Sequence, residues 1–181
     1  MHLIQAPRPD IAFPSPNCLV FLILLVDLTD SQIALKMTTK PTLIFAPGAW
    51  YPPTAFNPII EKLNAHGYTS HTVAFPSIQQ TPAVEDLQPD IATVRSLVEA
   101  EANAGKDVVV VSHSWSGLPV NSALDGLSKA DREKEGKTGG VVRLVFISAF
   151  IPDVGQSLIG AFGGTPPDWY IRDVSTHYAY L

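Results

Sequence analysis

The chain has 181 residues, of which 46% are hydrophobic and 16% charged, and its net charge is −5. This balance predicts one folded domain and excludes an intrinsically disordered chain, because disorder accompanies low hydrophobicity and high net charge. Lysine and arginine are scattered along the chain, so no nucleic-acid-binding surface is expected. The single cysteine, Cys18, excludes an internal disulfide and a Cys-rich zinc site, and it favours a reducing, cytoplasmic location.

Residues 1–36 differ in composition from the rest of the chain. Prolines interrupt the first part, and an unbroken apolar run then extends over residues 18–26. A transmembrane helix needs about 20 apolar residues, so this run predicts no stable membrane span. We interpret residues 1–36 as a disordered or apolar N-terminal extension, in which a tail or an added strand is favoured over a secretion signal or a membrane anchor at residues 18–26. A coherent pattern begins after Met37, which makes Met37 a candidate natural start.

Strands and helices alternate from residue 41 onward. Short apolar runs predict strands at residues 42–46, 69–75, 107–111 and 141–149. Apolar residues at helical spacing predict helices at residues 55–65, 86–104 and about 115–129, and residues 130–140 are expected to form a charged surface connection. Because crossovers between parallel strands are right-handed, this order predicts an α/β fold with a mostly parallel sheet of about four strands and helices on both faces.

A serine-rich segment, Ser112-His113-Ser114-Trp115-Ser116-Gly117, stands between the third predicted core strand and the helix after it. A nucleophile elbow places a serine on a sharp strand-to-helix turn, with small residues two positions before and after it, usually as G-x-S-x-G. Here Ser112 and Ser116 stand in place of both glycines, so Ser114 is the candidate nucleophile. The alternative interpretation is a serine-rich helix N-cap, which the sequence pattern alone supports equally well.

A second segment, Pro47-Gly48-Ala49-Trp50, directly follows the first core strand. Acyl transfer needs two N–H donors aimed at the oxyanion, one after the nucleophile and one from the loop after this strand. The candidate donors are therefore the N–H groups of Trp115 and Ala49, and Trp50 is a candidate wall of the substrate pocket. The alternative is an ordinary Pro-Gly turn in which Trp50 covers the edge of the core.

Together the two segments resemble the α/β-hydrolase superfamily, in particular the small esterases related to plant methylesterases and hydroxynitrile lyases. The resemblance covers about residues 41–170 and implies that Ser114 is the nucleophile and that Ala49 and Trp115 supply the oxyanion hole. Pro47 stands where this family usually has histidine. By the same resemblance, residues 37–181 are the N-terminal portion of an α/β-hydrolase domain, and a cap region begins at about residue 152.

The acid and the histidine of the catalytic triad are not identified in this sequence. In this family they follow the serine on loops after two further strands, so the chain resembles a C-terminally truncated member. His177 is the histidine downstream of Ser114, with Asp153, Asp168 and Asp173 in the cap region, and His177 reaches Ser114 only in a rearranged fold. An edge left unpaired after the last strand predicts self-association through that edge.

The remaining histidines and loops have structural interpretations. His113 lies within the elbow, His66 at a predicted helix end and His71 within a predicted strand. They form no pair at metal-binding spacing, and no loop has the glycine spacing of a dinucleotide or phosphate site, so neither a metal nor a cofactor is expected.

The leading functional hypothesis is a serine hydrolase acting on a small carboxylic ester, inactive if this chain is truncated. A second hypothesis is a non-catalytic hydrolase-like module that binds a small apolar ligand beneath Trp50, Trp115 and the cap. A third keeps the fold but changes the reaction to that of a lyase or an acyl transferase, since fold alone does not determine function.

Overall fold

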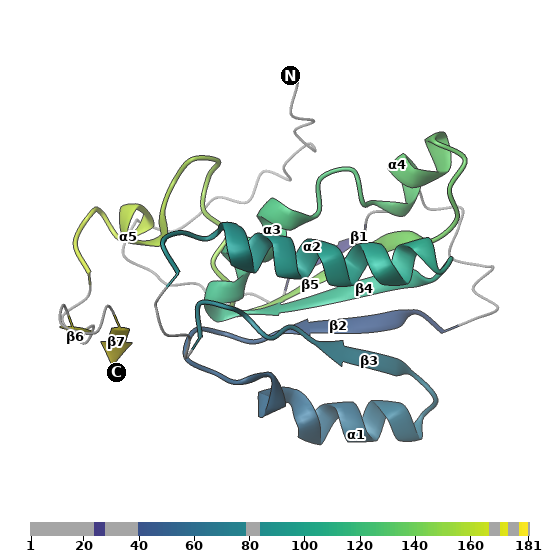
Figure 1. Cartoon of the computed structure of the whole chain (residues 1–181), viewed down its shortest axis with the longest axis horizontal. Coiled ribbons are helices and arrows are strands. Elements are labelled where there is room, and N and C mark those ends of the chain that lie inside the picture. Colours follow the sequence, from purple (N-terminus) through teal and green to yellow (C-terminus); the bar gives the residue numbers. More distant parts are fainter. Residues whose placement is uncertain (1–23, 28–39, 79–83, 167–170, 174–177, 181) are drawn as a thin grey trace.

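A five-stranded sheet forms the centre of the structure, a computed structural model that describes residues 24–27, 40–78, 84–166, 171–173 and 178–180 (Figure 1). The strands are β1 (Leu24–Asp27), β2 (Thr42–Ala46), β3 (Thr69–Thr72), β4 (Asp107–His113) and β5 (Gly140–Ile147). Their order in the sheet is β1-β5-β4-β2-β3. Strands β2 to β5 pair in parallel, as predicted, whereas β1 pairs with β5 in the antiparallel direction.

The helices lie on both faces of this sheet (Figure 1). Helix α1 (Asn57–Ala65), which follows a 3₁₀ turn at Pro53–Phe56, lies on one face, and α2 (Gln88–Asn103) and α3 (Gly117–Ala123) lie on the other. The remaining elements are α4 (Lys129–Lys134), α5 (Leu158–Ala161) and the antiparallel pair β6 (Ile171–Asp173) and β7 (Tyr178–Tyr180). The predicted parallel sheet with helices on both faces is therefore confirmed.

Alternation of side chains along the strands creates two separate cores. In β2, Ile44 and Ala46 pack in the core under α2 and α3, whereas Leu43 and Phe45 pack in the core beside α1. This alternation follows from the period of two in a strand, which sends successive side chains to opposite faces. The inner strands β2, β4 and β5 contain long apolar runs because helices lie on both faces, whereas the edge strand β3 is polar.

Two helix predictions differ from the structure. The helix expected to reach residue 129 ends at Ala123, and the turn after its C-cap contains Gly126 at φ +73°, a left-handed conformation through which a right-handed helix does not continue. The segment expected to be a charged connection instead contains α4. Its N-cap is Ser128, whose Oγ accepts a hydrogen bond from the Asp131 N–H at 3.0 Å, a capping interaction that the sequence pattern S-x-x-D already contained.

The outer edge of β5 is paired rather than free. Residues Leu24 to Asp27 of β1 lie opposite Phe146 to Arg143 of β5. The expectation that the last core strand leaves an unpaired edge is therefore wrong, because part of the N-terminal extension supplies the N–H and C=O partners that an edge strand lacks. Residues 18–23, the first part of the apolar run, lie outside the described residues. Across the described part of the chain, no helix is long and apolar enough to cross a membrane.

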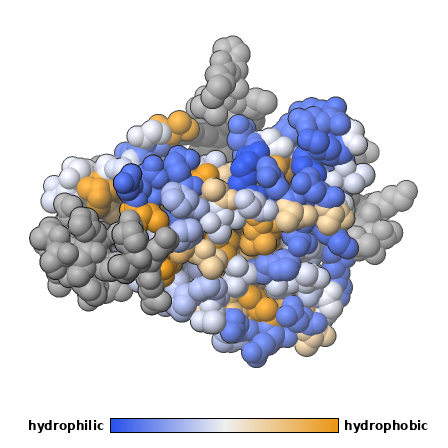
Figure 2. Space-filling view, viewed as in Figure 1, coloured by the Kyte–Doolittle hydropathy of each residue, from blue (hydrophilic) through white to orange (hydrophobic). Residues whose placement is uncertain are grey.

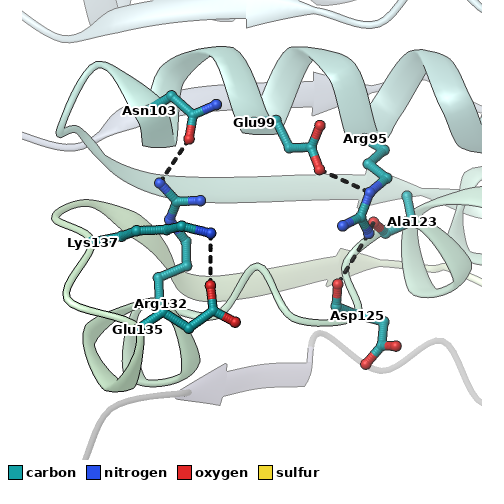
Figure 3. Close-up of polar contacts among 8 residues, drawn as sticks. All are labelled: Arg95, Glu99, Asn103, Ala123, Asp125, Arg132, Glu135 and Lys137. Carbon is teal, nitrogen blue, oxygen red and sulfur yellow. Dashed lines mark hydrogen bonds and ion pairs between the residues drawn. The ribbon is translucent and has the colours of Figure 1, made fainter.

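Polar contacts connect α2 to the end of α3, to the residues just after it and to α4 (Figure 3). Nη1 of Arg95 donates to the carbonyl oxygens of Ala123 and Asp125, each at 3.0 Å, and so satisfies carbonyls at the end of α3. Nη2 of Arg132 in α4 donates to Asn103 Oδ1 at 2.9 Å. In the view of Figure 2, the surface over α4 is strongly hydrophilic.

Candidate active site

Ser114 lies at a sharp turn between β4 and α3. Its φ is +55°, a left-handed conformation that costs a non-glycine residue about 1–2 kcal/mol. A 3₁₀ turn at Ser114–Ser116 follows immediately and leads into α3 at Gly117. The carbonyl of Ser114 accepts a hydrogen bond from the N–H of Phe150, just beyond β5, at 3.0 Å. A buried strand, a strained serine and a helix therefore follow one another, which is the geometry of a nucleophile elbow.

Two glycines make room for this turn. A Cβ added to Gly117 would lie 2.1 Å from the carbonyl oxygen of Phe150, and one added to Gly48 would lie 3.1 Å from the Cβ of Ser114. Neither space admits a side chain without movement of its neighbours. Gly117 therefore allows α3 to pass close to the chain after β5, and Gly48 brings the loop after β2 against Ser114.

The serines that stand in place of the elbow glycines are buried and bonded to each other. Ser112 is 1% exposed and Ser116 is fully buried, and their Oγ atoms lie 3.0 Å apart. Ser116 Oγ also accepts from the N–H of His113 at 2.9 Å and lies 2.8 Å from the carbonyl oxygens of His113 and Ala46. Sequence reasoning recognised these two serines only as small residues and missed their hydrogen bonds.

The loop after β2 carries the candidate oxyanion donor. Gly48 and Tyr51 close a turn in which the Tyr51 N–H donates to the Gly48 carbonyl oxygen at 3.3 Å. Trp50 adopts φ +65° and is 40% exposed, whereas Ala49 is half-buried. The close approach of Gly48 to Ser114 places residues 47–50 beside residues 112–117. The two segments that the sequence analysis combined into one candidate site therefore lie next to each other.

Trp115 follows Ser114, and its partly buried side chain packs against the core under α2 and α3. Its ring meets the Phe75 ring edge-on, with centroids 5.2 Å apart. This aromatic contact anchors the residue whose N–H is the other candidate oxyanion donor, so the backbone after Ser114 is held by its own side chain.

A cavity of about 270 Å³ opens beside this loop on the α1 side of the sheet. Its lining residues are Pro47, Gly48, Tyr51, Ala55, Phe56 and His113. Neither Trp50, the residue predicted to form a pocket wall, nor Ser114 lines this cavity.

Burial lowers the pKa of His113 below its usual value, so the ring is neutral at pH 7 and presents one donor and one acceptor nitrogen. The signal that could have indicated His113 is its position at the end of β4, where its side chain points away from the face of Ser112.

The described histidines occupy different parts of the fold. His66 caps the end of α1, and Nε2 of His71 in β3 lies 3.2 Å from Oε1 of Glu101. Within the described ranges, neither a histidine nor a carboxylate is hydrogen-bonded to the Ser114 side chain. His177 and Asp168 lie outside the described residues. Among those that are described, no cluster of three or more His, Cys, Asp or Glu side chains could hold a metal ion.

The sequence of this chain matches a protein family and curated relatives. The model of the alpha/beta hydrolase family matches residues 43–180. "Alpha/beta hydrolase nvfD" of Aspergillus novofumigatus is 35% identical over 121 residues, covering 67% of this chain and 48% of the relative. "Probable hydrolase R7" of a Phoma species is 34% identical over 129 residues, covering 70% of this chain and 49% of the relative. The chain thus spans about half the length of the curated relatives it matches.

A solved structure shares the fold at lower identity. It is an extracellular alpha/beta-hydrolase from a Paenibacillus species, described as sharing structural and functional homology with Tobacco Salicylic Acid Binding Protein 2. The match has a TM-score of 0.50 at 18% identity and covers 67% of this chain and 46% of that one. The family match, the two relatives and the shared fold agree with the sheet, and the chain belongs to the alpha/beta hydrolase family.

Proposed function

We propose that this chain carries the nucleophile and the oxyanion-binding loop of a serine hydrolase that acts on small carboxylic esters. The observation that supports this most directly is the strained φ of Ser114, +55°, at the end of β4, because such strain persists where the surrounding structure determines it and is typical of functional sites. The 3₁₀ turn and the helix that follow begin at Ser114, and the N-terminal end of a helical segment favours a developing negative charge nearby.

In the proposed reaction Ser114 Oγ attacks the ester carbonyl carbon and loses its proton to a base. The N–H groups of Ala49 and Trp115 stabilise the oxyanion of the tetrahedral intermediate, which collapses to an acyl-enzyme and releases the alcohol. Water then attacks the acyl-enzyme, and the free acid and Ser114 are regenerated. We propose that the base is a histidine outside the described residues, either His177 or one in sequence that continues past Leu181 in a longer protein.

Covalent labelling tests the role of Ser114. A fluorophosphonate should add once to the chain, as seen by intact mass, and peptide mapping should place the adduct on Ser114. Ser114→Ala should abolish labelling, whereas Ser122→Ala, which removes another serine hydroxyl from α3, should not. A folded protein that takes up no label would exclude catalysis by this chain.

The base is tested separately. If His177 is the base, His177→Gln should slow labelling of Ser114 by at least about 100-fold, the lower range for general-base catalysis. Unchanged labelling would exclude His177. Sequencing of the transcript past the codon for Leu181 would then show whether further strands, an acid and a histidine follow.

The cavity beside His113 supports a second proposal, a binding module for a small apolar ligand. Because Ser114 does not line this cavity, a ligand there does not depend on the nucleophile. Ligand-observed NMR with small aromatic esters should then show binding that survives Ser114→Ala and is lost in Ala55→Phe, which fills the cavity. Binding that Ala55→Phe leaves unchanged would exclude this cavity as the site.

A further inference from the structure

The Ser112–Ser116 pair, defined by the contact between the two Oγ atoms, connects the nucleophile elbow to the oxyanion loop. We propose that Ser116, supported by Ser112, is a positioning residue that sets the placement of Ser114 relative to Ala49; this inference rests on the proposed function. It stands on four contacts of one buried hydroxyl group, at 2.8–3.0 Å.

The hydrogen-bonding capacity of Ser116 is completely used. A serine hydroxyl has one donor and two acceptor positions. The His113 N–H donates to one lone pair, and when the Ser116 proton goes to a carbonyl oxygen, the Ser112 hydroxyl, 3.0 Å away, is the donor to the other. The Ser116 proton is then directed to the carbonyl oxygens, of which that of Ala46 is 2.8 Å away. Because the site is buried, these partners replace all the hydrogen bonds that water would supply.

The bond to Ala46 joins two functional segments that lie far apart in the sequence. Ala46 is the last residue of β2 and directly precedes the loop that carries Ala49, whereas Ser116 follows the nucleophile by two positions. Glycine at position 116 would fit the turn but could not make this bond. The serine therefore adds a direct connection between nucleophile and oxyanion donor, and a misplacement of about 1 Å between reacting groups can cost about 100-fold in rate.

The same hydroxyl also stabilises the strained turn. The His113 N–H, immediately before Ser114, has Ser116 Oγ as its partner, and without it this N–H would lose its bond. A residue at φ +55° keeps that conformation only while its neighbours determine it. Loss of the Ser116 hydroxyl should therefore loosen the turn at Ser114 before it affects the rest of β4.

The test compares Ser116→Ala, Ser112→Ala, the double variant and Ser122→Ala on the full chain. Ser122 is exposed and its Oγ donates to the Leu118 carbonyl at 3.0 Å, so its variant removes a hydroxyl from α3 without touching the elbow. The maximal fluorophosphonate labelling rate should fall at least about 10-fold in Ser116→Ala, with little change in the inhibitor's binding constant, and about two- to threefold in Ser112→Ala. The double variant should be no slower than Ser116→Ala, because Ser112 acts through Ser116.

A second measurement separates this inference from the proposed function. Hydrogen exchange of the His113 amide should rise at least about 10-fold in Ser116→Ala, while exchange of the Val110 amide in the middle of β4 stays the same. If the parent chain takes up no label, catalysis by this chain is excluded, but the exchange of the His113 amide still decides the positioning role. Unchanged exchange, or labelling losses that add in the double variant, would overturn it. If Ser116→Ala does not fold, Ser116→Gly takes its place.

Discussion

Ser114 occupies a backbone conformation that a serine adopts at a cost. At φ +55° its Cβ is crowded by the following carbonyl, whereas glycine has no Cβ and adopts this region freely. Ser114→Gly should therefore raise the free energy of unfolding by about 1 kcal/mol relative to Ser114→Ala, although both variants lose the hydroxyl group of the candidate nucleophile. Urea unfolding of the two variants measures the difference.

The matched control is Ser122→Gly in α3, where the backbone is an ordinary right-handed helix. There, Ser122→Gly should lower the free energy of unfolding by about 0.5–1 kcal/mol relative to Ser122→Ala. The reason is that glycine has more conformational freedom in the unfolded chain and relieves no strain in the folded one. Opposite signs at the two positions would identify stored strain at Ser114. The same sign at both would show that the elbow is relaxed.

The candidate nucleophile was predictable because the features that indicate it are local. A β-branched run from Val108 to Val111 predicts a buried strand, and the serine after it stands among small residues before a helical pattern. The bond from Ser116 to Ala46 was not predictable, since it joins positions 70 residues apart that only the sheet register brings together. The same holds for the cavity, whose residues come from the loop after β2, the 3₁₀ turn before α1 and the end of β4.

Among the elements, those with strong periodicity were predicted best. β2 has the predicted bounds, and α2 lies within the predicted range, since both combine regular apolar spacing with Pro or Gly at their ends. Helix α4 was missed because its six residues are mostly charged and carry no apolar stripe, so only the Ser128 cap indicated it. The sequence did not distinguish β1 from an unstructured tail. An apolar run alone does not determine whether it forms a strand or which strand it pairs with, here β5.

β1 makes a prediction about the sheet edge. Replacement of residues 24–27 by Gly-Ser repeats should remove the partner of β5. Among residues 143–146, the amides that point away from β4 should then exchange faster, because they lose their hydrogen bonds to β1. Hydrogen exchange with residue resolution measures this, with the Val110 amide as an internal control. Unchanged exchange at these amides would mean that β1 does not protect the edge.

The same variant tests self-association. An unpaired strand edge is a template for pairing with a second chain. The average molar mass of the variant, measured by light scattering, should therefore increase with protein concentration more steeply than that of the parent chain. A variant whose mass stays at one chain over the same concentrations would show that the β5 edge is not an association surface.

The two faces of the sheet are covered unequally in the described part of the molecule. The core under α2 and α3 contains twelve buried side chains, and the core beside α1 contains three, with the others on that face only partly buried. α1 packs near β2 and β3, and on the same face Val111 of β4 is buried, whereas Val109 of β4 and Val145 and Ile147 of β5 are only half-buried. Hydrophobic stabilisation scales with the apolar area removed from water, so the α2 side should contribute more to stability.

Valine truncations on opposite faces test this difference. Val110 in β4 is fully buried beneath α2 and α3, whereas Val145 in β5 is half-buried on the α1 side. Val110→Ala should lower the free energy of unfolding by about 2–3 kcal/mol, because it removes two methyl groups and leaves a cavity. Val145→Ala should cost about 1 kcal/mol, since the side chain already contacts water and the gap can fill with solvent. Equal losses in urea unfolding would mean that the α1 face is covered in solution by something outside the described residues.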